Sequence, residues 1–291
     1  MKFKLYTPQA ILEQGERQNQ EDCIFPLPGE ATAASRLFIV CDGMGGHDCG
    51  EVASTVVCQA ISRAMVRLNS EEEPLSDEQF RQVIGEAYRA LEAADTGHKA
   101  EMGTTLAFVC LHKGGCLAAH IGDSRIYHLR PRTGEVLYRS RDHSLVQQLY
   151  ELGKISYYDM FTSPQRNIIQ EAMQPFQETR SSATVVHITD IRKDDYLYLC
   201  SDGMLEEMDD DQLLNILKAH TNDEKKAQKL RHYTAGNLDN HSAYLIHIQD
   251  VEAEENDDLL PNDEKEERQK NKALNDPCKD MPWEAISSIL S

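Results

Sequence analysis

Two apolar runs joined by a short turn constrain the fold of this 291-residue chain most strongly. Residues 104–111 and 116–121 are almost wholly apolar or β-branched, and His112-Lys113-Gly114-Gly115 separates them. Two such runs around a few turn residues predict an antiparallel β-hairpin. Residues 125–129 follow shortly afterwards and are predicted to continue the same meander.

Helical patterns lie on both sides of this hairpin. Residues 51–69 read as a helix, and a second helix is predicted to begin at Ser76, where Ser76 and Gln79 form a capping box. Residues 144–153 and 210–219 are also predicted to be helical, and residues 37–41, 196–200 and 243–248 to be strands. Hairpin-linked strands between separate helix pairs predict an α+β fold, with antiparallel sheets inside and helices outside.

Two segments interrupt this pattern. Residues 153–180 mix glycine, prolines and aromatic residues without a period, which is typical of a functional flap or of a partly disordered loop. Residues 251–291 hold 12 acidic and 5 basic residues, which predicts a solvated, disordered tail. Its end, around Trp283, is amphipathic and is expected either to remain a weakly docked linker or to bind its own domain or a partner. The domain itself is predicted to cover residues 1–250.

The charge and the cysteines exclude several classes of protein. With 30 Lys and Arg against 49 Asp and Glu, the formal net charge is −19, which disfavours binding to nucleic-acid phosphates and to anionic membranes. No stretch is apolar enough to span a membrane, and the first residues lack the apolar core of an export signal. The eight cysteines form no CxxC pair. We therefore expect a reducing, cytoplasmic location.

Several aspartates stand where a predicted strand begins or ends. Asp42, Asp123 and Asp202 follow apolar runs, and Asp22 and Asp239 precede them. Because central strands gather their ends at a shared edge, these side chains could converge. Each pair such as Asp-Gly is also an ordinary turn dipeptide, and taken singly each is explained as a turn.

Converging carboxylates repel one another unless they are protonated or bind a cation. An oxygen-only set without matching His or Cys favours Mg²⁺ or Mn²⁺ over Zn²⁺. A Gly after Asp allows a sharp turn and leaves a bare carbonyl as a further ligand. Two bridged ions would generate hydroxide near neutral pH and bind a phosphoryl oxygen.

The five aspartates belong to a set of seven motifs that follow one another along the chain. They are Arg17-Gln18-Asn19-Gln20-Glu21-Asp22; Asp42-Gly43-Met44-Gly45-Gly46-His47 with Gly50-Glu51 and Ala53-Ser54; Gly103-Thr104-Thr105; Gly122-Asp123-Ser124-Arg125; Asp142-His143-Ser144-Leu145; Ser201-Asp202-Gly203; and Asp239-Asn240. This set, spread over about residues 10–250, resembles the metal-dependent Ser/Thr protein phosphatases of type 2C, the PPM family. The Asp42 motif resembles the bacterial branch of that family.

The resemblance implies a sandwich of two antiparallel β-sheets flanked by helix pairs, with two Mn²⁺ or Mg²⁺ ions at one end and a third, weaker ion. The resemblance implies that Asp42 bridges the two ions, that Gly43 binds through its carbonyl, and that Asp202 and Asp239 complete the ligands of one ion. It implies that Asp22 binds through water and that Glu21 ligates or supports the other ion. It also implies that Asp123 binds the third ion and that Arg17 binds the substrate phosphate.

The implied activity is hydrolysis of phosphoserine and phosphothreonine in proteins by a metal-activated hydroxide, with Arg17 offsetting charge on the phosphate. The resemblance implies phosphorylated proteins as partners, with Ser/Thr kinases among them, and a role in signalling; we expect a monomer. A non-catalytic regulatory module on the same fold is the alternative.

The sequence departs from the family pattern at two places. Met44 stands where the animal branch has a His that is proposed as general acid, and we interpret His47 as structural, so the general acid is unassigned. After the flap, members often show an Arg and a Gly that follow an Asn-Leu-like stretch, and residues 166–173 (Arg-Asn-Ile-Ile-Gln-Glu-Ala-Met) lack both at those places. We interpret His143 as structural.

Overall fold

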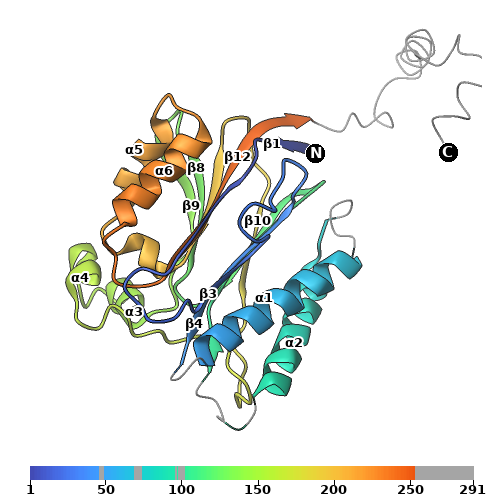
Figure 1. Cartoon of the computed structure of the whole chain (residues 1–291), viewed down its shortest axis with the longest axis vertical. Helices are drawn as coiled ribbons and strands as arrows, with labels where there is room; N and C mark the ends of the chain where they lie inside the picture. The colour runs from blue at the N-terminus through green and yellow to red at the C-terminus, as the bar shows by residue number, and fades with distance from the viewer. Residues whose placement is uncertain (46–48, 69–73, 96, 98–101, 253–291) are drawn as a thin grey trace, which may run out of the picture. The chain divides into compact units, whose positions relative to one another are not determined.

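The computed structural model describes residues 1–45, 49–68, 74–95, 97 and 102–252, and Met1–Glu252 form one compact unit. Two six-stranded antiparallel sheets lie at the centre of this unit (Figure 1). The first has the order β1 (Lys2–Leu5), β12 (His241–Glu252), β11 (Tyr196–Cys200), β8 (Arg125–Arg130) and β9 (Glu135–Arg139), with β2 (Gln9–Glu13) paired to β12. The second has the order β10 (Thr184–Ile188), β7 (Gly115–Ile121), β6 (Leu106–His112), β4 (Leu37–Met44) and β3 (Asp22–Phe25), with β5 (Gly103–Thr104) paired to β4.

Helices cover the outer face of each sheet (Figure 1). On the second sheet lie α1 (Cys49–Leu68) and α2 (Asp77–Ala94), and on the first lie α5 (Asp210–Lys218) and α6 (Asp223–Thr234). The short helices α3 (Leu145–Glu151) and α4 (Tyr157–Thr162) stand between β9 and β10 in the chain, and a 3₁₀ turn, η1 (Asp202–Leu205), follows β11. The predicted α+β class with two antiparallel sheets is confirmed.

The central strands are apolar on both faces because each sheet is buried on both sides. In β6, Phe108 packs toward α1 and α2, whereas Val109 packs into the layer between the sheets. All seven residues of β6 and of β7 are buried. This burial accounts for the continuous apolar runs in the sequence.

The β6–β7 hairpin and the Ser76–Gln79 capping box are confirmed. The prediction that residues 125–129 continue the meander is wrong, because β7 belongs to the second sheet and β8 to the first. The chain changes sheets between Ile121 and Arg125, where Gly122 has φ +95°. Only glycine adopts this conformation at low cost, so the chain turns away from β7 there.

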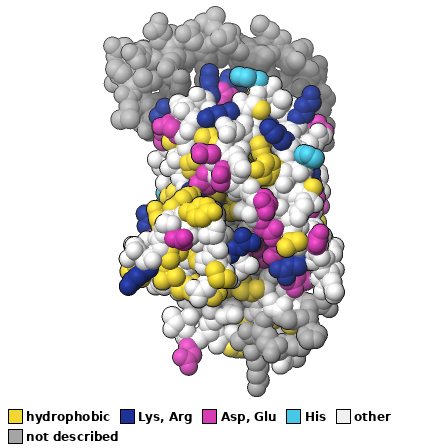
Figure 2. All heavy atoms as spheres, turned by 90° about the vertical axis from the view of Figure 1, so that its left-hand side faces the viewer, with side chains coloured by type: hydrophobic (Ala, Val, Ile, Leu, Met, Phe, Trp, Pro, Cys, Tyr) yellow, Lys and Arg dark blue, Asp and Glu magenta, His cyan; other side chains and the backbone are white. Residues whose placement is uncertain are grey.

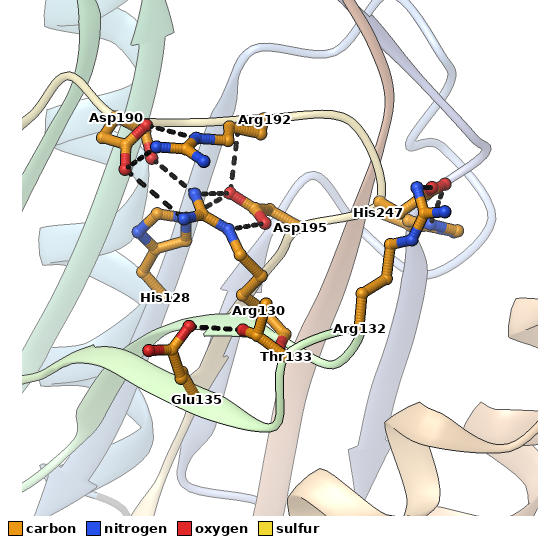
Figure 3. A network of polar contacts seen from close by, with 10 residues as sticks. His128, Arg130, Arg132, Thr133, Glu135, Asp190, Arg192, Asp195 and His247 are labelled. Carbon is orange, nitrogen blue, oxygen red and sulfur yellow. Dashed lines mark hydrogen bonds and ion pairs between the residues drawn. The ribbon is translucent and has the colours of Figure 1, made fainter.

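A polar network fixes the far ends of β8 and β11 (Figure 3). Asp195 accepts hydrogen bonds from the guanidinium of Arg130 (2.8 Å) and from the backbone N–H of Arg192 (2.9 Å), and its Oδ2 lies 2.8 Å from His128 Nε2. Burial raises the pKa of Asp195, but these hydrogen bonds outweigh burial and lower it to about 2. The network therefore joins the two strands at the end opposite to Asp123 and Asp202.

Three further expectations can be compared with the described residues. β12 runs to Glu252, so the predicted domain boundary at residue 250 falls inside a strand, and the predicted tail from residue 253 onward lies outside the described residues. The seven cysteines that the structure describes form no disulfide bond with one another. In the described part of the chain, no helix combines the length and apolarity needed to cross a membrane.

Candidate metal centre

The five aspartates come from both sheets of the sandwich. Asp22 in β3 and Asp42 in β4 are direct partners in the antiparallel register. Asp123 lies where the chain changes sheets, Asp202 is the first residue of η1, and Asp239 comes just before β12. Burial and the charge of Asp202 raise the pKa values of both Asp42 and Asp123, so these side chains lie close enough to repel one another. The two sheets therefore contribute carboxylates to one place.

Asp42 and Gly43 do not form a turn, contrary to expectation, because β4 continues through both residues to Met44. The glycine is needed for a different reason. A Cβ at Gly43 would lie 2.1 Å from the carbonyl oxygen of Gly50 and 2.5 Å from that of Glu21. The N–H of Gly43 donates to the Glu21 carbonyl at 3.1 Å. Gly43 thus permits β4, α1 and the Glu21 segment to approach one another.

Burial and mutual repulsion raise the pKa values of four of these aspartates. Burial, followed by the charges of Asp202 and Asp239, raises the pKa of Asp22 to about 7. Burial and the charge of Asp239 raise that of Asp202 to about 6. The pKa values of Asp42 and Asp123 are also raised, by burial first and then by the neighbouring aspartates. Such a set gains stability when positive charge lies among its members.

Two oxygens in this group lack hydrogen-bond partners. Asp22 Oδ2 accepts from the Ser201 hydroxyl at 2.8 Å, but Asp22 Oδ1 and Asp123 Oδ1 are buried and without a partner among the described residues. Buried carboxylate oxygens are normally paired. Among the described residues, no three His, Cys, Asp or Glu side chains are arranged around one position that could hold a metal ion. The fit to cations therefore rests on the oxygen-only chemistry, the repulsion and the orphaned oxygens.

A cavity of about 100 Å³ opens beside the aspartates. Asp123, Asp202 and Asp239 line it. Its other walls are formed by Arg125, Asp142, Val146, Met160, Arg166, Asn167, Leu205 and Glu206. The volume suits a phosphate-sized group, but carboxylates outnumber the two arginines in the lining, so a phosphate would need cations to bind there.

Arg17 reaches the centre through Asp239. Its guanidinium donates to Asp239 Oδ2 at 2.6 Å while the arginine side chain stays 52% exposed. This hydrogen bond raises the pKa of Arg17 further. Asn240 holds the loop that carries Arg17, since its amide donates to the carbonyls of Gln14 (2.7 Å) and Asn19 (3.0 Å). Arg17 is therefore available to an anion in solution.

The backbone of Glu21 makes hydrogen bonds to two neighbouring segments. Its N–H donates to Asn240 Oδ1 at 2.8 Å, and its carbonyl accepts from the Ser54 hydroxyl at 2.5 Å. Its carboxylate lies near Gly50 in the first turn of α1, where a Cβ would be 2.9 Å from Glu21 Oε1. Glu21 thus joins β3, α1 and the segment before β12. His47 lies outside the described residues.

Sequence reasoning missed three residues of this centre. Arg125 forms a two-pronged hydrogen bond to Asp142, at 2.7 and 2.6 Å, in the wall of the cavity. Glu206 accepts from the backbone N–H of Leu238 at 2.9 Å and so fixes the approach to Asp239. Arg125 and Asp142 stand in the quoted motifs and were a usable signal, but nothing in the sequence marks Glu206.

Known proteins resemble the chain in sequence and in fold. Residues 16–234 match the protein phosphatase 2C family. A putative protein phosphatase 2C-type protein of Streptococcus pyogenes is 28% identical over 242 residues, which cover 82% of this chain and 96% of that protein. The serine/threonine phosphatase Stp of Listeria welshimeri is 33% identical over 197 residues, which cover 66% of this chain and 75% of that protein.

Solved structures agree with these matches. The crystal structure of the Mycobacterium tuberculosis serine/threonine phosphatase PstP/Ppp has a TM-score of 0.70 and 28% identity, covering 84% of this chain and 99% of that one. The catalytic domain of PstP in complex with two manganese ions has a TM-score of 0.69 and 27% identity, with the same coverage.

Proposed function

The chain belongs to the protein phosphatase 2C family, and from this premise we propose that it hydrolyses phosphoserine and phosphothreonine in proteins with the aid of two divalent cations, Mn²⁺ or Mg²⁺. The observation that carries the proposal is the convergence of five aspartates from both sheets, four of them with raised pKa values. Two of their buried oxygens lack a partner among the described residues.

The proposed ligands follow from this convergence. We propose that Asp42 bridges the two ions, that Gly43 contributes its carbonyl, and that Asp202 and Asp239 complete one ion. Asp22 and Glu21 support the other ion, and Asp123 serves a third, weaker one. When bound, such ions supply positive charge and a nucleophilic oxygen at neutral pH.

We assign phosphate binding to Arg17. A guanidinium can donate two parallel hydrogen bonds to a phosphoryl dianion, which a lysine cannot. Its pairing with Asp239 supports this role, because the side chain is held beside the aspartates and remains exposed. The substrates would be proteins phosphorylated by Ser/Thr kinases. We place this activity in residues 1–252, with residues 153–180 as a flap.

The test is hydrolysis of p-nitrophenyl phosphate and of a phosphoserine/phosphothreonine peptide panel with Mn²⁺, with Mg²⁺ and with EDTA. We expect activity with Mn²⁺ or Mg²⁺ and none with EDTA. Asp42→Ala and Asp202→Ala should each lower kcat/KM by at least about a hundredfold, because each removes a charge from the cation site.

Asp190→Ala is the matched control. Asp190 is 60% exposed and bonds Arg192 at the other end of the sandwich, so its loss should leave kcat/KM within about twofold of the wild type. Equal hydrolysis in EDTA, or full activity of Asp42→Ala, would contradict the proposal. Metal binding without turnover of any substrate would favour a regulatory module.

A further inference from the structure

A row of polar contacts leads from the wall of the cavity toward α5. Arg125, which holds both oxygens of Asp142, also donates to the hydroxyl of Tyr127 at 3.3 Å. The Tyr127 hydroxyl in turn donates to Asp210 Oδ1 at 3.0 Å. Asp210 is the first residue of α5, where the helix dipole favours a negative charge. The cavity wall is thus connected to the start of α5.

Arg139 extends this row to α4. Its Nη1 donates to Asp210 Oδ2 at 2.7 Å and to the Tyr157 hydroxyl at 3.1 Å. The guanidinium carbon also lies 5.9 Å from the centre of the Tyr157 ring. The side chains of Arg139 and Asp210 are 26% and 24% exposed, so solvent screens this ion pair less than it screens a surface pair.

The contact from Arg139 adds to the packing that holds the short helix α4, where the rings of Tyr150 in α3 and Tyr157 lie edge to face with their centres 5.8 Å apart. The helix spans six residues, and six residues do not form a stable helix alone. Met160 is buried, whereas Tyr157 is 42% and Tyr158 is 72% exposed. Figure 2 shows hydrophobic side chains gathered on the face that carries α3 and α4, beside Asp and Glu side chains. The hydrogen bond from Arg139 links α4 to β9 and, through Asp210, to the start of α5.

The position of α4 matters because Met160 lines the cavity beside Asp123, Asp202 and Asp239. The loop after α4 supplies Arg166 and Asn167 to the same cavity. A displacement of α4 would move this wall and leave the aspartates in place, since they belong to other elements. A peptide chain extends past its phosphoryl group on both sides, so it contacts more of this wall than a small aryl phosphate does.

We propose that Arg139 is a positioning residue that holds α4 against the cavity, and that this placement is required to bind phosphorylated polypeptides but not small phosphate esters. The second part rests on the proposed function. Arg139 touches neither the aspartates nor Arg17 in the described contacts, so it acts through Tyr157 and α4.

The main test compares Arg139→Met with the wild type on a phosphopeptide and on p-nitrophenyl phosphate, both with Mn²⁺. We expect KM for the phosphopeptide to rise about tenfold, with kcat and both constants for p-nitrophenyl phosphate within about twofold. Arg139→Lys keeps the charge toward Asp210 and should recover part of the loss. Tyr157→Phe should raise the phosphopeptide KM, and adding it to Arg139→Met should cause little further change, because the two residues act through one contact.

The matched control is Arg180→Met. Arg180 also pairs with a carboxylate, Glu92 at 2.6 Å, and also lies over a tyrosine, with its guanidinium 5.0 Å from the Tyr88 ring centre. Arg180 is the last residue of the 153–180 segment, and these contacts tie it to α2 on the other sheet. It lines a separate pocket with Tyr88 and is not among the residues that line the cavity beside the aspartates. Its removal should change neither substrate's KM by more than about twofold.

Hydrogen exchange gives a readout that does not depend on activity. In the full-length protein, Arg139→Met should speed exchange of backbone amides in residues 153–170 by at least about fivefold and leave α2 unchanged. Unchanged exchange in residues 153–170 would overturn the positioning role, and equal KM changes for both substrates would overturn the selective effect on polypeptides. A wild type inactive on both substrates would contradict the proposed function, and the exchange comparison would still decide whether Arg139 holds α4.

Discussion

The two carboxylate oxygens of Asp22 have different surroundings, and this difference bears on its proposed role as a metal ligand. Its Oδ2 accepts a hydrogen bond from Ser201, and Ser201 in turn accepts from the N–H of Ser242 at 2.9 Å. Its Oδ1 has no such partner among the described residues. Ser201 thus orients the carboxyl group and leaves one oxygen available. Neighbours of this kind tune metal ligands.

This arrangement predicts the effect of Ser201→Ala. The substitution removes the donor that orients Asp22, while the small change in volume should preserve the fold. Mn²⁺ affinity should fall by about tenfold, as measured by isothermal titration calorimetry.

Ser140→Ala provides the control for Ser201→Ala. Ser140 is equally buried, and its hydroxyl accepts from the N–H of Ile126 at 2.9 Å and has no described hydrogen bond to any of the five aspartates. Its Mn²⁺ affinity should equal that of the wild type. If both variants bind Mn²⁺ as tightly as the wild type, Asp22 is not oriented by Ser201 for metal binding.

The aspartates could be predicted as candidate site residues because each stands beside an apolar run. This pattern is local and can be read from one sequence. The contact between Asp22 and Ser201 could not be predicted, because it joins residues 179 positions apart. Glu206 was missed for a similar reason. Its role depends on the backbone of Leu238, and no residue type near it signals that contact.

At the level of elements, the hairpin and the first helices could be predicted, but the sheet to which a strand belongs could not. β8 follows β7 after three residues and still joins the other sheet. Pattern alone does not separate these outcomes, because both strands are apolar. α6 was missed because its sequence is mostly polar, and few of its residues, such as Leu230, are buried.

The junction between η1 and β12 predicts a large effect of Gly203→Ala. A Cβ at Gly203 would lie 2.0 Å from the carbonyl oxygen of Asn240, so the two elements would have to separate. The free energy of unfolding should fall by about 3 kcal/mol, as measured by urea denaturation.

Gly236→Ala is the control for this clash. A Cβ at Gly236 meets no atom within 4 Å, so the substitution should be neutral or raise the unfolding free energy by up to about 1 kcal/mol. Equal stability of the Gly203 and Gly236 variants would show that η1 can move without cost.

For the whole molecule, the candidate centre depends on the packing of the two sheets against each other. Asp22 and Asp42 come from the second sheet, and Asp202 follows a strand of the first. The buried layer between the sheets contains residues such as Val40, Val109 and Leu199, which hold the two halves together. The sequence indicates that each aspartate stands beside an apolar run, but it does not show that the candidate centre draws on both sheets.

The end of β12 predicts where the chain can be shortened. β1 pairs with the last part of β12, from Lys2 opposite Glu252 to Leu5 opposite Ile248. A chain that ends at Glu252 keeps all of these pairs and loses only residues 253–291. We expect its thermal midpoint to stay within about 2 °C of the full-length value, with unchanged phosphatase activity.

A chain that ends at His247 should behave differently. It loses Ile248, which is fully buried, and every β12 partner of β1, so Phe3 and Leu5 lose their support. At about 3 kcal/mol for a buried aliphatic side chain, its thermal midpoint should fall by about 10 °C. Calorimetry on the full-length chain, the chain that ends at Glu252 and the chain that ends at His247 tests both expectations. A lower midpoint or lower activity already in the chain that ends at Glu252 would show that the acidic residues 253–291 contribute to the domain, whereas equal midpoints for all three chains would mean that β1 is held without β12.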